Sequence, residues 1–409
     1  MLSFKYRCSE CGREYAIEPH LMLCPDCSSE QGKDEPLRGI LEVKLTGAID
    51  RGGAPGGAPA GEGGRGRHSS GLAAGSTPAW STYDLLPVAR NWFPPIPVGN
   101  TPLWEPRRLR EELELPELYI KDDTANPTGS LKDRASYLVA AYAASQEIED
   151  IVVASTGNAG SSMAGVGAAA GLHVRLYLPG AAPEAKMVQS LQFGADLVQV
   201  DGSYDDAFAQ SLEYSAEHGG LSRNTGYNPL TIEGKKTVSL EIFRQLGEKM
   251  PDYVFLSAGD GVIMSGVYKG FEDLVELGLA DRMPTICMVQ AQGSQAISRA
   301  LERGSFGEPE PAETIADSIS VDVPSAGHFA VGRLRRHGGR AVVVSDEDIL
   351  AAQHRLAATT GLFCEPAAAA AAAGFFAIRD EIPEDATVVL LITGNGLKDV
   401  ASAKKGVGL

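Results

Sequence analysis

From residue 118 onward, short apolar runs alternate with longer segments of helical character. The runs have the length and β-branched content of buried strands and cover residues 118–121, 151–154, 174–178, 197–200, 253–257, 285–289, 341–344 and 388–392. The intervening segments 135–144, 163–171 and the alanine-rich 367–373 favour helices. Strands that alternate with helices form parallel sheets, so we predict an α/β fold with its site at the carboxyl ends of strands.

The N-terminal part of the chain has a different composition. Residues 51–77 are rich in Gly, Ala, Pro and Ser and lack apolar periodicity. Such a segment predicts a flexible linker or a disordered loop. We therefore divide the chain into a small N-terminal unit over residues 1–36, a Gly/Pro-rich linker over 37–80 and a large region over 81–409.

Four of the six cysteines lie in the N-terminal unit. They form two Cys-x-x-Cys pairs, Cys8 with Cys11 and Cys24 with Cys27, separated by twelve residues. This spacing suits a tetrahedral thiolate site, and we predict a zinc ribbon with a structural Zn²⁺. A redox pair or a nucleic-acid finger is less favoured, because the segment is acidic and has no basic helix.

Charge and hydropathy narrow the range of partners. With 53 acidic and 36 basic residues, the 409-residue chain has a net charge of −17. This charge argues against nucleic-acid binding, since phosphate backbones need basic patches. There is no run of 18 apolar residues and no signal-like stretch in the first 20 residues, so we expect no membrane partner and a cytoplasmic location.

Lys132 stands where a polar turn meets an apolar helix, in the run Asn-Pro-Thr-Gly-Ser-Leu-Lys-Asp-Arg over residues 126–134. A lysine at a helix start opposes the macrodipole and adds little stability there. The same position favours the neutral amine, which is the form that makes an imine with an aldehyde cofactor. The alternative is a solvated surface lysine.

Three other strand ends carry candidate site residues. Ser155, Thr156, Gly157 and Asn158 follow the strand at 151–154 and open a helix, an arrangement that can cradle an anion but also serves as ordinary N-cap chemistry. Thr393 ends the strand at 388–392. A small-residue turn follows the strand at 253–257 and is the best candidate for a phosphate nest of backbone N–H groups; it contains Gly259, Asp260, Gly261, Val262 and Ile263. We expect the Asp260 carboxylate to face away from a phosphate or to cap the helix.

Six ordered motifs give the chain a resemblance to a known enzyme family. They are Gly99–Leu103, residues 126–134, residues 155–158, Asn228-Pro229 with residues 233–237, Glu365-Pro366-Ala367 and residues 393–398. Over roughly residues 80–400 the chain resembles the fold-type II pyridoxal-phosphate (PLP) enzymes, and within them the threonine synthases. The resemblance implies a tryptophan-synthase-beta-like fold with two parallel-sheet domains and a smaller mobile subdomain around residues 135–230.

The resemblance also implies roles for single residues. Lys132 would bind the cofactor aldehyde and later move protons at the substrate carbons, and Asn158 would hydrogen-bond the cofactor's 3-hydroxyl oxygen. Thr393 would lie against the pyridine nitrogen, where a hydroxyl moderates carbanion stabilisation and favours elimination over transamination. Ser155, Thr156 and Gly157 would contact the substrate.

The reaction implied is the conversion of O-phosphohomoserine and water to threonine and phosphate by a homo-oligomer, expected to be a dimer. Thr231 departs from the family pattern, which has an arginine for the substrate phosphate at this place. Lys235, Lys236 or Arg223 could supply the charge, or could be solvated instead. A serine/threonine dehydratase or a cysteate-synthase-like enzyme that uses phosphoserine is the alternative, and a non-catalytic PLP-binding regulatory protein is a third hypothesis.

Overall fold

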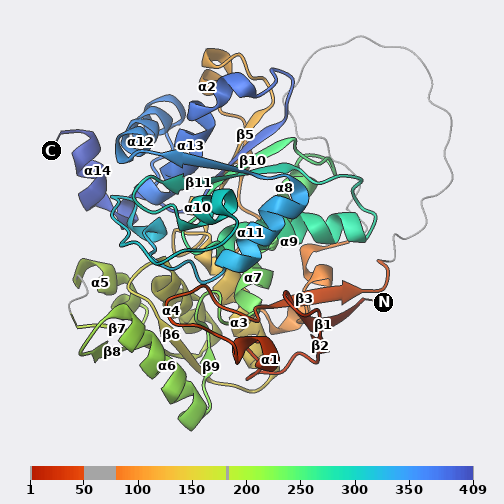
Figure 1. Ribbon diagram of the computed structural model, residues 1–409, viewed down its shortest axis with the longest axis vertical. Helices are drawn as coiled ribbons and strands as arrows, with labels where there is room; N and C mark the ends of the chain where they lie inside the picture. Colours follow the sequence, from red (N-terminus) through yellow and green to blue (C-terminus); the bar gives the residue numbers. More distant parts are fainter. Residues whose placement is uncertain (1, 50–79, 181–183, 409) are drawn as a thin grey trace.

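The computed structural model describes residues 2–49, 80–180 and 184–408 (Figure 1). Two sheets dominate the structure, one in the upper and one in the lower half of Figure 1. The linker predicted over residues 51–77 lies outside the described residues.

The larger sheet has six strands in the order β12-β11-β10-β13-β5-β4. Their bounds are Arg340–Val344, Thr285–Ala291, Tyr253–Ser257, Val388–Ile392, Leu118–Asp122 and Leu103–Trp104. All neighbours are parallel except β4, which pairs antiparallel with β5 at the edge. The five predicted strands of this sheet are confirmed.

Helices cover both faces of the larger sheet, because successive strand residues enter different cores. Phe255 packs with α12 (Asp346–Thr360) and the alanine-rich α13 (Pro366–Ala377), whereas Val254 and Leu256 pack with α8 (Thr237–Gln245) and α9 (Val262–Glu276). This alternation follows from the period of two in a strand. It explains why these strands are almost uniformly apolar.

The smaller sheet has four parallel strands in the order β8-β7-β6-β9. Their bounds are Asp196–Val200, His173–Pro179, Asp150–Ala154 and Leu221–Ser222. Helices α3 (Lys132–Ser145) and α4 (Asn158–Ala170) share a core with one face, and α6 (Tyr204–His218) packs on the other. This sheet lies inside the range predicted for the smaller subdomain.

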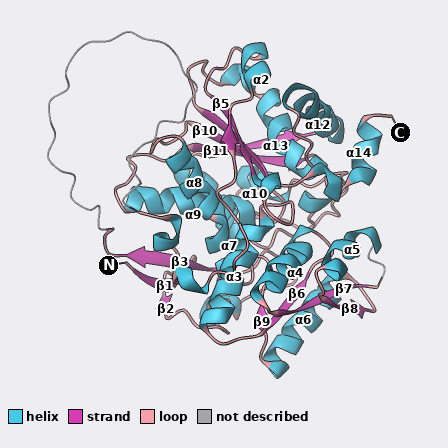
Figure 2. Cartoon of the chain, turned by 180° about the vertical axis from the view of Figure 1, so that it is seen from behind, coloured by secondary structure: helices cyan, strands magenta, loops and turns pink. Residues whose placement is uncertain are grey.

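A short helix, α7 (Leu230–Lys235), lies between α3 and α9, in the region between the two sheets (Figure 2). Two glycines allow the close approach. A Cβ at Gly234 would lie 2.4 Å from the carbonyl oxygen of Arg134, and a Cβ at Gly266 would lie 2.6 Å from Cβ of Lys235. Helix α7 is therefore held firmly between the helix that begins at Lys132 and the helix that follows the predicted phosphate nest.

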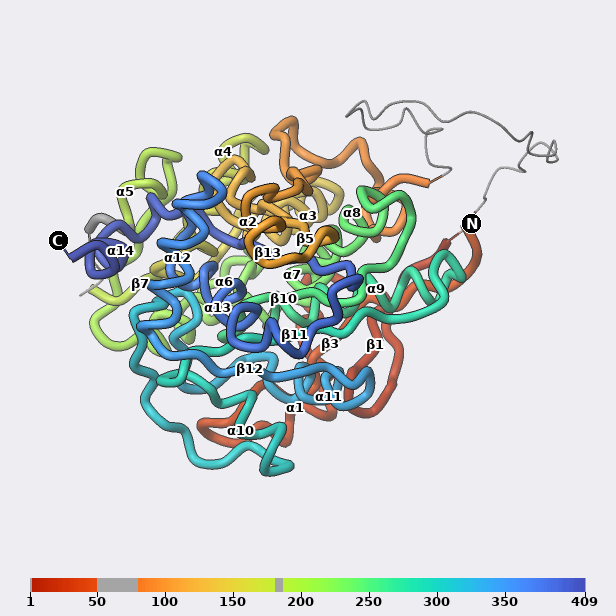
Figure 3. The backbone as a smooth tube through the Cα atoms, turned by 90° about the horizontal axis from the view of Figure 1, so that it is seen from above, coloured from red at the N-terminus to blue at the C-terminus, as the bar shows by residue number. Residues whose placement is uncertain are grey.

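The N-terminal ribbon extends beyond residue 36. Strand β3 (Leu41–Thr46) pairs antiparallel with β1 (Ser3–Cys8), and β2 (Glu14–Tyr15) pairs with the other edge of β1. The ribbon, which also contains α1 (Pro25–Ser28), lies beside α9 and α11 (Gly327–His337) (Figure 3). Its side chains join the core formed by α3, and Arg333 of α11 pairs with Glu42 of β3 at 2.6 Å.

The remaining elements lie at the periphery of the two sheets. They are the helices α2 (Arg107–Glu112), α5 (Glu184–Gln192), α10 (Ala296–Arg303) and α14 (Val400–Gly406), with short 3-10 turns at Thr82–Leu85, Arg90–Trp92, Asp123–Ala125, Asp317–Ile319, Arg379–Glu381 and Gly396–Lys398.

Candidate active site

The turn before Lys132 is bound to the end of strand β13. The backbone N–H of Leu131 donates to the carbonyl oxygen of Thr393 at 2.8 Å, and that of Asn395 donates to Gly129 at 2.9 Å. Gly129 has a φ of +82°, a conformation that favours glycine. These bonds fix Lys132, the first residue of α3, beside the carboxyl end of the larger sheet.

The half-buried Lys132 lines a narrow cavity of about 20 Å³. Its walls come from the ends of β10 and β13, the starts of α3, α4, α9 and α13, and the turn at Asp317–Ile319. The lining residues are Ser130, Leu131, Lys132, Asn158, Ser257, Ile263, Ser318, Ile319, Glu365, Ala367 and Thr393. The structure thus brings together four of the predicted residues, Lys132, Asn158, Ile263 and Thr393.

Burial lowers the pKa of Lys132, and the neighbouring Arg223 lowers it further. The carboxylates of Asp260 and Glu365 act in the opposite direction without outweighing burial. A lowered pKa increases the fraction of neutral amine, which is the nucleophilic form. The environment therefore supports the chemistry predicted for this lysine.

Glu365 is a cavity residue to which our sequence analysis assigned no role. Both of its carboxylate oxygens accept from the amide nitrogen of Asn158 at 3.0 Å. Burial raises the pKa of Glu365, although Asn158 and the nearby lysines oppose the rise. A Cβ at Gly394 would lie 2.1 Å from Oε1 of Glu365, so this carboxylate requires a glycine after Thr393. The sequence signals were the family motif Glu365-Pro366-Ala367 and the position of Glu365 before a proline at the start of α13.

The predicted phosphate nest forms the turn between β10 and α9. Gly261 has a φ of +80°, and the first bond inside the helix runs from Ser265 to the carbonyl oxygen of Gly261 at 2.9 Å. Within the described chain, the N–H groups of residues 259–263 have no backbone acceptor. Unpaired N–H groups at the start of a 15-residue helix suit a phosphate.

Two fully buried cations, Arg223 and Lys235, lie near Lys132. Lys235 Nζ donates to the carbonyl oxygen of Thr231 at 2.9 Å. Arg223 donates to Thr225 Oγ1 at 2.6 Å and to Ser136 Oγ at 3.2 Å, and its Nη2 has no partner among the described residues. Among the residues that the structure describes, neither Arg223 nor Lys235 has a carboxylate within ion-pairing distance.

The pKa shifts show that these cations are close enough to repel one another. Burial lowers the pKa of Lys235 far below its usual value, and Lys132 and Arg223 lower it further. Burial also lowers the pKa of Arg223 to about 10, against the opposing effects of Tyr204 and Asp133. Buried cations without ion pairs are costly for stability, so this arrangement favours an anionic ligand.

One of the two placements expected for Asp260 is not observed. Its carboxylate does not cap α9, whose N-cap Gly261 has no side-chain bond, and it raises the pKa of both Lys132 and Lys235. The Asp260 carboxylate is therefore close enough to both lysines to favour their charged forms. Only its backbone N–H remains suited to a phosphate.

The other predicted substrate residues are placed less uniformly. Lys236 faces away from Lys132, and its Nζ donates to the carbonyl oxygen of Leu85 and to the carboxylates of Glu233 and Asp273. At the start of α4, Ser155 Oγ accepts from Gly157 and Gly160 at 3.2 and 3.1 Å, and Thr156 lies in the same turn.

The four N-terminal cysteines converge, as their spacing predicted. Their sulfur atoms all lie within 4.8 Å of one another, and the pairs Cys8–Cys27 and Cys11–Cys24 are 3.7 Å apart. A tetrahedral zinc with bonds of about 2.3 Å separates its sulfur ligands by about 3.8 Å. The donor set and its spacing therefore fit one structural Zn²⁺.

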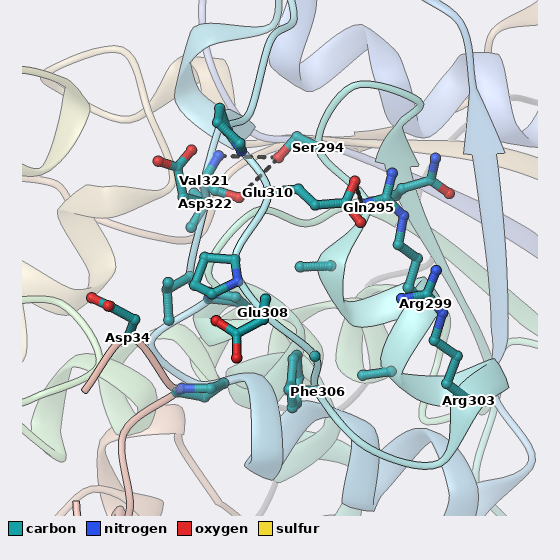
Figure 4. Close-up of a pocket in the computed structure, with 18 of the residues that line it drawn as sticks. Asp34, Ser294, Gln295, Arg299, Arg303, Phe306, Glu308, Glu310, Val321 and Asp322 are labelled. Atoms are coloured by element: carbon teal, nitrogen blue, oxygen red, sulfur yellow. Dashed lines mark hydrogen bonds and ion pairs between the residues drawn. The ribbon is translucent and has the colours of Figure 1, made fainter. Parts of the chain in front are cut away.

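A wider cavity, of about 310 Å³, lies apart from these residues (Figure 4). It is formed by α10, the following loop and the ribbon residues Asp34 and Pro36. Arg299 and Arg303 lie on one side and the carboxylates of Asp34 and Glu308 on the other. None of the candidate active-site residues lines it, so we assign the chemistry to the narrower cavity around Lys132.

Comparison with known proteins decides the family. The model of the family described as pyridoxal-phosphate dependent enzyme matches residues 96–394. The chain belongs to the pyridoxal-phosphate dependent enzyme family. It is similar to the threonine synthase of Methanosarcina acetivorans, with 33% identity over 97% of this chain and 92% of the relative. The threonine synthase of Mycobacterium tuberculosis strain H37Rv is 35% identical over 79% of this chain and 88% of that protein.

Solved structures of the PLP-dependent family share the fold. Threonine deaminase isoform 2 of Solanum lycopersicum matches with a TM-score of 0.65 and 23% identity over 75% of this chain and 83% of its own. Maize serine racemase matches with a TM-score of 0.65 and 21% identity, and the match covers 73% of this chain and 89% of the racemase chain. The predicted fold-type II PLP enzyme is therefore confirmed. Among the described residues, no helix is both long and apolar enough to cross a membrane.

Proposed function

We propose that this PLP-dependent enzyme is a threonine synthase, which converts O-phosphohomoserine and water to threonine and phosphate. Relatives with that name cover most of the chain at 33–35% identity. The observation that carries the proposal is the pair of buried cations, Arg223 and Lys235, beside Lys132. A phosphorylated substrate provides the anion that this pair lacks.

The residues around Lys132 suit the cofactor. Lys132 would bind its aldehyde, the N–H groups of residues 259–263 its phosphate, and Thr393 would lie against its ring nitrogen. Ser130 Oγ lines the same cavity and is a buried hydroxyl without a partner among the described residues. When bound, PLP withdraws electrons from the substrate carbons and so makes their protons removable.

Lys132 and the cation pair would then act on different ends of the substrate. The neutral amine of Lys132 can accept a proton from a substrate carbon and return it, which its lowered pKa favours. Arg223 and Lys235 would hold the phosphate by charge-assisted hydrogen bonds and stabilise it as it leaves. Arg223 has an unused N–H donor for this purpose.

The overall reaction breaks the bond between Cγ and the phosphate oxygen. The bonding electrons leave with phosphate, Cγ ends as a methyl group, and the hydroxyl of water adds at Cβ. Because the cavity is only about 20 Å³ and lies between the ends of β10 and β13 and the start of α4 in the smaller subdomain, we propose that this subdomain opens to admit ligands. Closure would then exclude bulk water from the reacting carbons.

The phosphate site distinguishes the alternatives. A serine/threonine dehydratase has no substrate phosphate and therefore no use for the cation pair, even though threonine deaminase shares the fold. A cysteate-synthase-like enzyme would use the pair for phosphoserine and stays the second candidate. A non-catalytic PLP-binding protein would not need Lys132 at a lowered pKa beside a second anion site.

The ribbon completes the proposal. We infer that Cys8, Cys11, Cys24 and Cys27 hold one Zn²⁺ with a structural role, since the four sulfur atoms would supply all the ligands of a tetrahedral site. A cytoplasmic homodimer is the form that we propose for the enzyme.

A substrate screen on the purified, PLP-loaded enzyme tests the function. O-phosphohomoserine, phosphoserine, serine and threonine are supplied separately, and phosphate, ammonia and amino-acid products are measured. Threonine and phosphate from O-phosphohomoserine support the proposal. Ammonia from serine or threonine would favour the dehydratase, and phosphate from phosphoserine alone would favour the cysteate-synthase-like enzyme.

A further inference from the structure

Ile40 connects the cysteine ribbon with both parts of the proposed anion site. It precedes β3 and is 2% exposed. Together with Ile232, Val262, Ala326 and Phe329 it forms a small buried apolar cluster, separate from the main cores. The cluster therefore joins the ribbon to α7 and to the first residue of α9.

The cysteine knuckles hold the backbone on either side of Ile40. The N–H of Ser9, in the first knuckle, donates to the carbonyl oxygen of Ile40 at 2.9 Å, and the N–H of Cys24 donates to Gly39 at 2.7 Å. Gly39 has a φ of +69°, and a Cβ there would lie 3.0 Å from the carbonyl oxygen of Cys24. The position of Ile40 therefore depends on the arrangement of both cysteine pairs.

On its other side, the cluster reaches the residues that would bind anions. Ile232 lies three residues before Lys235, about one turn of α7. Val262 is the first residue of α9 and belongs to the predicted phosphate nest. A shift of Ile40 would therefore act on the cation Lys235 and on the nest together, because packed cores transmit displacement.

We propose that Ile40 is a positioning residue through which the metal-bound ribbon fixes the anion site. The effect of Ile40 on binding of the substrate phosphate rests on the proposed function. The effect of Ile40 on binding of the cofactor phosphate rests only on the assignment of residues 259–263 as the phosphate nest. Loss of the metal would release the knuckles from Gly39 and Ile40, and α7 and the nest would lose their support.

The test compares Ile40→Ala with Val43→Ala, a truncation of another buried β-branched side chain in the ribbon core that lies outside the Ile40 cluster. The dissociation constant of PLP is measured by absorbance as each enzyme, freed of PLP, is titrated with the cofactor. The dissociation constant of inorganic phosphate is measured by calorimetry on each PLP-loaded enzyme. We expect Ile40→Ala to weaken both by about three- to tenfold relative to Val43→Ala. Ile40→Val should restore most of the loss, since it keeps a β-branched side chain.

Metal removal provides the second arm. Stripping the ribbon of zinc, verified by elemental analysis, should weaken PLP binding in the wild type and have little further effect in Ile40→Ala, because coupled changes are not additive. Equal PLP affinities for Ile40→Ala and Val43→Ala, or fully additive effects of metal loss and Ile40→Ala, would overturn the inference. A wild type that retains PLP but binds no phosphate would count against the proposed function, while the PLP measurements still decide the role of Ile40.

Discussion

Arg223 lies close enough to Lys235 to lower the pKa of its ammonium group, although both side chains are fully buried. Neither has an ion-pairing carboxylate among the described residues, while most other buried cations nearby do. Lys236, the next residue along the chain, pairs with Glu233 and Asp273. The contrast between two adjacent lysines indicates that Lys235 is kept for a ligand.

Lys235→Met should raise the KM for O-phosphohomoserine by roughly ten- to a hundredfold, the range expected for a lost charge-assisted hydrogen bond. Steady-state phosphate release measures this value. The control is Lys249→Met, which removes an exposed lysine just beyond the end of α8 and should leave KM unchanged. Lys235→Met should also unfold at a higher temperature than the wild type, because it removes the cost of burying a lysine amine without an ion pair. An unchanged KM would remove Lys235 from the substrate site.

Anion affinity should fall as the pH rises above the lowered pKa of Lys235. Burial lowers the pKa of Lys235 and so favours its neutral amine, whereas a bound anion favours the charged form, so we expect binding to take up a proton. Sulfate is a suitable probe because its charge is constant over this range. Calorimetry should show affinity falling by up to about tenfold per pH unit, and the slope should disappear in Lys235→Met. A slope that persists in the variant would assign the proton to another group.

Asp260→Asn should strengthen sulfate binding by about three- to tenfold, because Asp260 is the carboxylate that competes with an anion for Lys132 and Lys235. The substitution keeps the backbone N–H of the nest and nearly the same shape. Titration of both proteins at one ionic strength gives the comparison. Weaker binding by the variant would mean that Asp260 orders the nest rather than competing with the ligand.

The start of α3 depends on a buried ionic network around Glu241. Its carboxylate accepts from Lys121 at 2.7 Å and from Arg134, which also binds Asp123. Burial raises the pKa of Glu241, but Arg134 and Lys121 lower it to about 2. Glu241→Gln should reduce the free energy of unfolding by roughly 3–5 kcal/mol, since it leaves buried cations unbalanced. Denaturant titration measures the loss, with the exposed Glu217→Gln as control.

The sign of the pH effect follows from the lowered pKa. Glu241 stabilises the folded enzyme fully above its ordinary pKa of 4.5, and this contribution is lost as the pH falls toward 2. The wild type should therefore lose stability over this interval more steeply than Glu241→Gln. Equal slopes would show that the network does not depend on the charge of Glu241.

Sequence patterns predicted the eight core strands and placed Lys132, Asn158 and Thr393 at one site, because strand periodicity and strand-end geometry are local properties. Glu365 was recognised only as part of a family motif and was given no role, since its role depends on a contact with Asn158, 207 positions away along the chain. The expectation that Asp260 could cap α9 was wrong, because the N-cap position of that helix is Gly261 and has no side-chain hydrogen bond. The predicted ribbon ended too early, at residue 36, because β3 is recognised as a ribbon strand only from its pairing with β1.

The most direct test of the proposed threonine synthase activity is the reaction of the PLP-loaded wild type with O-phosphohomoserine, in which inorganic phosphate and threonine are quantified together. We expect equal amounts of both products from the wild type and neither product from Lys132→Ala, whose cofactor should no longer become covalently attached on borohydride reduction. Absence of phosphate release by the wild type, or turnover that survives in Lys132→Ala, would contradict it.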